Sequence, residues 1–125
     1  MRTERVEFTG AMGGQLSARM DLPEGPPRAY AIFAHCFTCN KDLNVTTQVC
    51  AGLTQHGIGV LRFDFTGLGQ SEGDFAATNF TTNMEDLLAA SDWLEQNHQA
   101  PSLLVGHSLG GAAVLAVAHE MPHIK

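Results

Sequence analysis

The chain has 125 residues and a net charge of −6, with 44% hydrophobic and 16% charged residues. These values are typical of one soluble globular domain, and the negative charge argues against nucleic acid or anionic membranes as partners. No apolar run reaches the ~18 to 20 residues that would cross a bilayer, and residues 1–8 lack the apolar block of a secretory signal. Three cysteines, an odd number, fit a reducing compartment better than a disulfide-bonded fold. We therefore expect a cytoplasmic protein.

The first 22 residues predict an antiparallel hairpin. Val6 and Phe8 alternate with charged residues, and Gly13-Gly14 allows the chain to reverse. From residue 15 to residue 22, apolar and polar side chains then alternate at every position. A period of two indicates a half-buried strand. We expect this pair at an edge of the sheet.

Three later runs are almost continuously apolar, at residues 29–34, 58–63 and 103–105. Such runs are typical of parallel strands that are covered on both faces. Since helical patterns lie between these runs, we expect an α/β fold, a mostly parallel sheet with helices on both faces.

Three helices are predicted around these strands. The first covers residues 44–56, with Val45, Val49 and Leu53 at helical spacing. The second covers residues 79–98, with Thr78 or Asn79 as its cap. Its apolar face consists of Phe80, Met84, Leu87, Leu88, Ser91 and Leu94. The third begins at Leu109 and ends near Glu120, before Pro122.

The box Gly106-His107-Ser108-Leu109-Gly110 falls between a predicted strand and a predicted helix. In that context it predicts a tight turn that lifts the Ser108 hydroxyl above the sheet. Gly106 and Gly110 leave room for neighbouring backbone. The Leu109 N–H, at the start of the helix, would then stabilise an oxyanion that forms when Ser108 attacks a carbonyl.

Two further loops follow predicted strands and should reach the same crevice. His35-Cys36-Phe37-Thr38 follows residues 29–34, which makes the Phe37 N–H the second oxyanion donor. The loop of residues 64–71 follows the strand that ends at Phe63. Its first residue, Asp64, is interpreted as a turn-forming carboxylate that accepts backbone N–H groups rather than as a catalytic acid.

The ordered motifs of residues 34–42, 62–73 and 106–111 resemble the α/β-hydrolase superfamily. More narrowly, the chain is similar to the hydrolase part of bacterial proteins that fuse such a domain to an OsmC-type peroxidase domain. The resemblance covers essentially the whole chain and implies an esterase-like serine hydrolase, with Ser108 as nucleophile and no cofactor or metal. Related enzymes usually have His-Gly where this chain has His35-Cys36.

A serine nucleophile needs a neighbouring histidine as base, and in this fold the acid and the histidine follow the serine. Only 17 residues follow Ser108 (125 − 108), and His107 on the turn is expected to point elsewhere. His35 is the one candidate near the crevice, and we interpret it as structural. We therefore expect one incomplete hydrolase domain over residues 1–125, with feeble activity on activated esters when isolated. The strand of residues 103–105 should expose an edge through which the chain could form a homodimer.

Two other classes of function remain open. The Cys36-x-x-Cys39 pair after a strand is compatible with a thiol redox site. With His35 and Cys50 or His56, it could instead form a partial zinc site. The chain could also be a non-catalytic interaction module. If it is an enzyme, esters are the expected small-molecule substrates, and amides or peptides the alternative.

Overall fold

The structure is a computed structural model that describes residues 2–35, 44–73, 78–106, 114 and 124. Its elements, in chain order, are β1 (Arg2–Thr9), β2 (Gln15–Leu22), β3 (Ala29–Ala34), α1 (Asn44–Gln55), β4 (Ile58–Phe63), α2 (Phe80–Asn97) and β5 (Leu103–Gly106). The strands form one sheet in the order β1-β2-β4-β3-β5. The predicted strands at residues 29–34 and 58–63 are confirmed to the residue.

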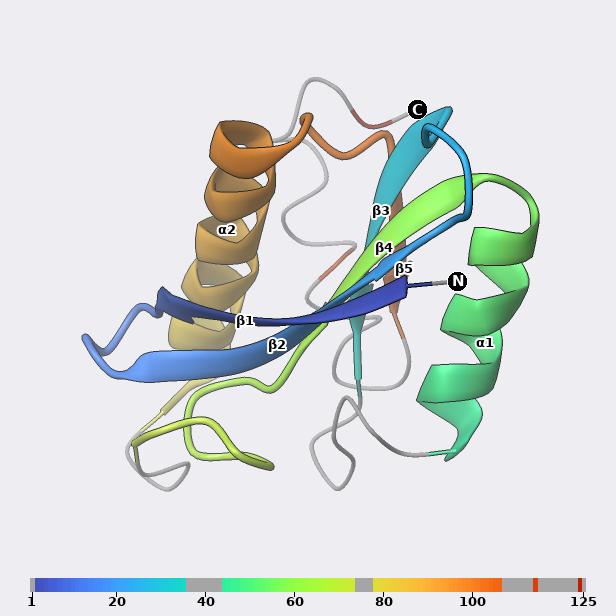
Figure 1. Cartoon of the computed structure of the whole chain (residues 1–125). Coiled ribbons are helices and arrows are strands. Elements are labelled where there is room, and N and C mark those ends of the chain that lie inside the picture. The colour runs from blue at the N-terminus through green and yellow to red at the C-terminus, as the bar shows by residue number, and fades with distance from the viewer. Residues whose placement is uncertain (1, 36–43, 74–77, 107–113, 115–123, 125) are drawn as a thin grey trace.

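The sheet is mixed and strongly twisted (Figure 1). The β1–β2 hairpin is antiparallel and pairs with β4 through β2, also antiparallel. Strands β4, β3 and β5 are parallel to one another. The predicted hairpin at a sheet edge is therefore confirmed, and so is the α/β fold class.

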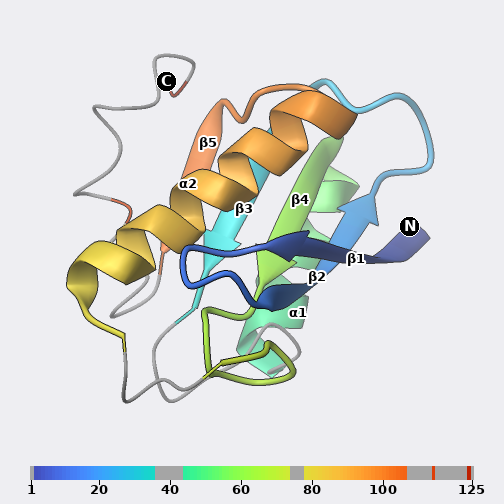
Figure 2. The same ribbon diagram turned by 90° about the vertical axis from the view of Figure 1, so that its left-hand side faces the viewer.

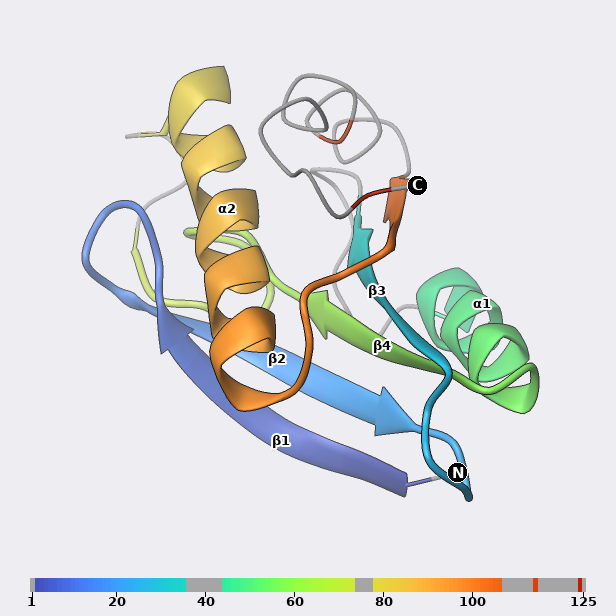
Figure 3. The ribbon, with the colours of Figure 1, turned by 90° about the horizontal axis from the view of Figure 1, so that it is seen from above.

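Helices α1 and α2 lie on opposite faces of this sheet (Figures 2 and 3). On the α2 face, a large apolar core joins α2 to the sheet, and Leu104 of β5 packs against it as a partly buried side chain. Its buried members are Phe8, Leu16, Ala18, Met20, Leu22, Tyr30, Ile32, Ala34, Leu61, Phe63, Phe65, Leu87, Ala90 and Leu94. Burial of this apolar surface is the main stabilising term of the fold.

The capping prediction for α2 is also confirmed. The Asn79 side chain accepts a hydrogen bond from the Thr82 N–H at 2.9 Å, and the Asn79 N–H donates to the Thr82 hydroxyl at 2.9 Å. This reciprocal pair satisfies two backbone donors of the first turn and sets where the helix begins.

Neither α2 nor any other helix among the described residues is long and apolar enough to span a bilayer.

The predicted helix over residues 44–56 is confirmed by α1, and its Leu53 side chain is half-buried against the sheet core. Val49 is exposed, however. The side chains of α1 that are described as buried are Thr46, Cys50 and Thr54. These three follow one another at a spacing of four residues, so they share one face of the helix. Cys50 packs there with Ala31, Phe33 and Val60 of the sheet. Small side chains let α1 lie close to the strands.

The polar face of β2 is more buried than the alternation predicts, because Ser17 and Asp21 are buried while Gln15 is exposed. Asp21 is 1% exposed and accepts hydrogen bonds from Arg62 Nε at 2.8 Å and from the Thr3 hydroxyl at 2.7 Å. The Arg62 side chain is itself 8% exposed. A buried charge requires a partner of opposite charge. Asp21 of β2 and Arg62 of β4 provide this for each other as a buried ion pair.

Candidate functional site

The three parallel strands end side by side. In the sheet register, Ala34 of β3 lies between Phe63 of β4 and Gly106 of β5. The residues that follow these strands therefore start from neighbouring points on one edge of the sheet. This is the carboxyl edge, where ligands bind in open α/β sheets.

His35 and Asp64, the first residues after β3 and β4, are in contact at this edge. Their relative exposures are 1% and 0%, and 3.4 Å separates His35 Nε2 from Asp64 Oδ1. The imidazole also meets the ring of Phe65 edge-on, with 5.3 Å between the ring centroids. This burial and packing fit the structural interpretation of His35, because a general base must reach the substrate proton.

The loop of residues 64–73 folds around the other carboxylate oxygen of Asp64. Oδ2 accepts the Gln70 N–H at 3.0 Å, while the Ser71 hydroxyl donates to the Asp64 carbonyl at 2.6 Å. The same hydroxyl accepts the Ser17 N–H of β2 at 2.8 Å. Asp64 thus acts on the backbone as a turn-forming residue, in the manner that the sequence indicates.

Gly69 of this loop has no room for a side chain. Its φ is +53°, and a Cβ atom there would collide with the Asp64 carboxylate. Gly69→Ala is therefore expected to destabilise the protein by about 2–3 kcal/mol, through backbone strain and displacement of Asp64. Urea denaturation measures this loss.

Gly25→Ala is the matched control for that substitution. A Cβ atom at Gly25 would meet nothing within 4 Å, so its effect should stay within about 0.5 kcal/mol. Equal losses for the two variants would contradict the close fit around Asp64.

Asp86 is a residue of this region that sequence reasoning missed. The sequence places it in the first two turns of α2, yet its side chain is 0% exposed. Its Oδ1 accepts the Ala11 N–H and its Oδ2 accepts the Thr66 N–H, each at 2.8 Å. The available signal was its position next to the buried stripe of α2, where a carboxylate needs partners.

Most of the predicted site residues lie outside the described residues. Ser108 and the oxyanion donors Phe37 and Leu109 belong to this group, as do His107 and Gly110. Of the predicted site, the structure describes His35, Asp64 and Gly106, and it places all three at the same edge. Of the third predicted helix it describes Val114, which is helical.

The thiol and metal alternatives depend on the three cysteines of the chain, of which the structure describes only Cys50. Cys36 and Cys39 lie outside the described residues, whereas Cys50 is buried between α1, to which it belongs, and the sheet. Burial first, and then the nearby Asp21 carboxylate, raise the pKa of the Cys50 thiol to about 12. Such a thiol stays protonated at neutral pH and is a poor nucleophile and metal ligand. The described part of the chain contains no group of three metal-ligating side chains.

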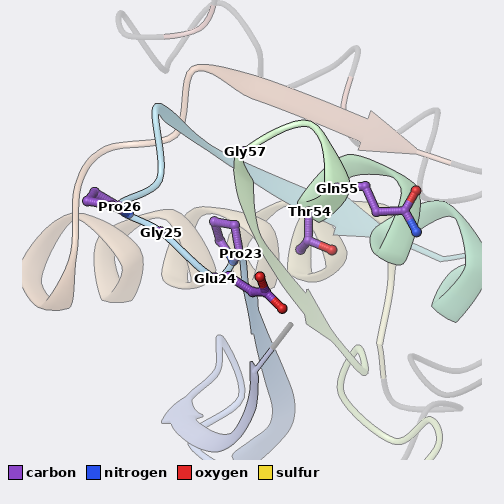
Figure 4. Close-up of a pocket in the computed structure, with 7 residues that line it drawn as sticks. All are labelled: Pro23, Glu24, Gly25, Pro26, Thr54, Gln55 and Gly57. Carbon is purple, nitrogen blue, oxygen red and sulfur yellow. The ribbon is translucent and has the colours of Figure 1, made fainter.

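A surface hollow lies at the other end of the parallel strands (Figure 4). Its lining comes from the loop before β3 and from the C-terminal end of α1 with the turn that follows: Pro23, Glu24, Gly25, Pro26, Thr54, Gln55 and Gly57. Because these residues precede β3 and β4, the hollow faces away from His35 and Asp64. It is therefore separate from the predicted crevice.

The chain resembles several solved serine hydrolases over nearly its whole length. It is 52% identical to the esterase domain of a Rhodothermus marinus protein, with a TM-score of 0.81, covering 100% of this chain and 48% of that one. A lidless α/β serine hydrolase from Xanthomonas campestris is 27% identical, with a TM-score of 0.83, covering 97% and 57%.

Among curated proteins, mouse monoglyceride lipase is 30% identical over 117 residues, which are 92% of this chain and 38% of the lipase. The chain thus spans about half or less of the length of the first relatives it matches. The family model described as serine aminopeptidase, S33, matches residues 25–125. That match covers most of the chain, which therefore belongs to this family of the α/β-hydrolase superfamily.

Proposed function

We propose that the chain carries the nucleophile and the oxyanion donors of a serine ester hydrolase. The Ser108 oxygen attacks the ester carbonyl carbon, and the N–H groups of Phe37 and Leu109 hold the resulting oxyanion. The alcohol then leaves with a proton, and an acyl group remains on Ser108. Water adds to this acyl-enzyme, releases the acid and returns the proton to Ser108.

The observation that carries this proposal is the common end of the three parallel strands. Because Ala34 lies in register between Phe63 and Gly106, the segment that contains Phe37 and the segment that contains Ser108 both leave from neighbouring strands. A nucleophile and an oxyanion donor must approach one carbonyl group from two chain segments, and adjacent strand ends make that possible.

The general base and acid of this mechanism are proposed to lie outside residues 1–125. Among the described residues, His35 is the histidine that lies at this edge. Its burial against Asp64 and Phe65 supports a structural role, in which it fixes the loop after β3 to the loop after β4. The related proteins that carry the words esterase and lipase favour an ester as substrate, whereas the description of the family model makes a peptide the alternative.

Fluorophosphonate labelling of the natural gene product tests the proposal, because rapid modification requires an activated serine. We expect a single adduct, which mass spectrometry locates on Ser108. Ser102→Ala is the control, since Ser102 uses only its backbone N–H to bond Tyr30, and this variant should be labelled normally. A protein that folds but resists the probe would contradict the proposed nucleophile and favour the non-catalytic alternative.

A further inference from the structure

We propose that Asp86 is a positioning residue for the candidate site, and that it couples the β1–β2 turn to the loop of residues 64–73. This proposal rests on the proposed function, since the loop in question borders the edge where Ser108 would act. Asp86 itself is not a catalytic residue, because its two oxygens are occupied by backbone N–H groups.

Both oxygens of the Asp86 carboxylate accept backbone N–H groups. A fully buried carboxylate that accepts two N–H groups at 2.8 Å holds both donors tightly, because bonds to an ionised acceptor are stronger than neutral ones. The donors belong to Ala11 and Thr66, which are 75 and 20 residues away along the chain. One side chain of α2 therefore fixes two loops at once.

Thr66 is connected to the candidate site through the two residues that precede it. Its neighbour Phe65 is 0% exposed and packs edge-on against the rings of His35 and Phe63. Asp64, one residue further, contacts His35. A shift of the Thr66 backbone would thus reach His35 through two contacts, and His35 directly precedes the segment that contains Phe37.

The β1–β2 turn lies close to Asp86. A Cβ atom at Gly10 would stand 2.8 Å from Asp86 Oδ1 and 2.8 Å from the side chain of Leu16. The turn therefore fits closely around the carboxylate. The loop of residues 64–73 is also bonded to the start of β2. The Gln15 N–H donates to Glu72 Oε1 at 2.9 Å, and the Glu72 N–H donates to the Gln15 carbonyl at 2.9 Å.

Asp86→Asn is the test variant, since the amide keeps the shape of the side chain but retains only one acceptor oxygen. Asp92→Asn is the matched control, an exposed carboxylate on the same helix with the same change of charge. In Asp86→Asn we expect amide hydrogen exchange at Thr66 or Ala11 to become at least about tenfold faster. The imidazole NMR resonances of His35 should shift as well, and neither change should occur in Asp92→Asn.

Kinetics on the natural gene product then separate positioning from a purely structural role. At a temperature where both variants are fully folded, kcat of Asp86→Asn for p-nitrophenyl acetate should fall about tenfold, while KM stays within about twofold. Gly10→Ala, which presses on Asp86 without altering it, should move the His35 resonances in the same direction. Gly25→Ala should not move them.

The proposal is overturned if the His35 resonances or kcat of Asp86→Asn match those of the wild type while the Thr66 or Ala11 amide has lost its protection. It is also overturned if neither amide loses protection. Should Asp86→Asn fail to fold, unchanged His35 resonances in Gly10→Ala would reject the coupling. A wild type without Ser108-dependent activity would refute the proposed function instead, and the exchange and NMR measurements would still decide the role of Asp86.

Discussion

Ser108→Ala is expected to lower kcat of the natural gene product for p-nitrophenyl acetate at least about 1,000-fold. The reason is that the proposed acyl-enzyme cannot form without the serine oxygen, so only the weak effect of the oxyanion donors and of substrate binding would remain. Steady-state kinetics with the purified variant, checked for folding by circular dichroism, measure the loss.

Three comparisons make this result specific. Ser102→Ala should keep wild-type kcat, and an amino-acid p-nitroanilide as second substrate separates ester from peptide hydrolysis. Residues 1–125 by themselves should hydrolyse the ester feebly, because the proposed base and acid lie elsewhere. Rapid turnover by residues 1–125 that depends on Ser108 but not on His35 would refute the placement of the base.

Arg62→Met is expected to destabilise the protein by about 3–5 kcal/mol, because it leaves the Asp21 carboxylate buried without its cation. The pair is bonded at 2.8 Å, with side-chain exposures of 8% and 2%. Urea denaturation gives the free energy of unfolding. Adding Asp21→Leu should restore most of the stability, since an apolar pair of similar size replaces a buried ion pair at little cost.

Arg2→Gln is the control for this prediction, because Arg2 forms an exposed pair with Glu4 at 3.3 Å, with side-chain exposures of 71% and 44%. Solvent screens such a pair, so the variant should lose no more than about 0.5 kcal/mol. If Arg62→Met cost no more than Arg2→Gln, the buried pair would contribute nothing to stability.

The strands and helices could be predicted from the sequence because their signals are local. The continuous apolar runs of β3 and β4 and the Asn79 cap of α2 each lie within a few residues. The predicted parallel order of the strands also implied that the loops beginning at His35 and Asp64 leave the same edge of the sheet. The direct contact between these two side chains was not predicted, because it depends on how the loop after β4 turns back.

The interactions that were missed connect distant parts of the chain. The residues of α1 that are described as buried are two threonines and a cysteine, whereas apolar spacing included the exposed Val49 among its three positions. Asp21 and Asp86 are charged residues, a type that is usually exposed. Their partners, Arg62 and Ala11, are 41 and 75 positions away along the chain. Local periodicity contains no information about such partners.

Because β3, β4 and β5 end in register with one another, the fold tolerates insertions and deletions in some segments and not in others. Adding or removing one residue within β3 or β4 would shift the paired register and turn every following side chain to the opposite face. His35 and Asp64 would then no longer meet. The loop of residues 23–28, at the far ends of these strands, can change in length without moving them. Natural variants of this chain should therefore differ in length at that loop and keep β3 and β4 unchanged.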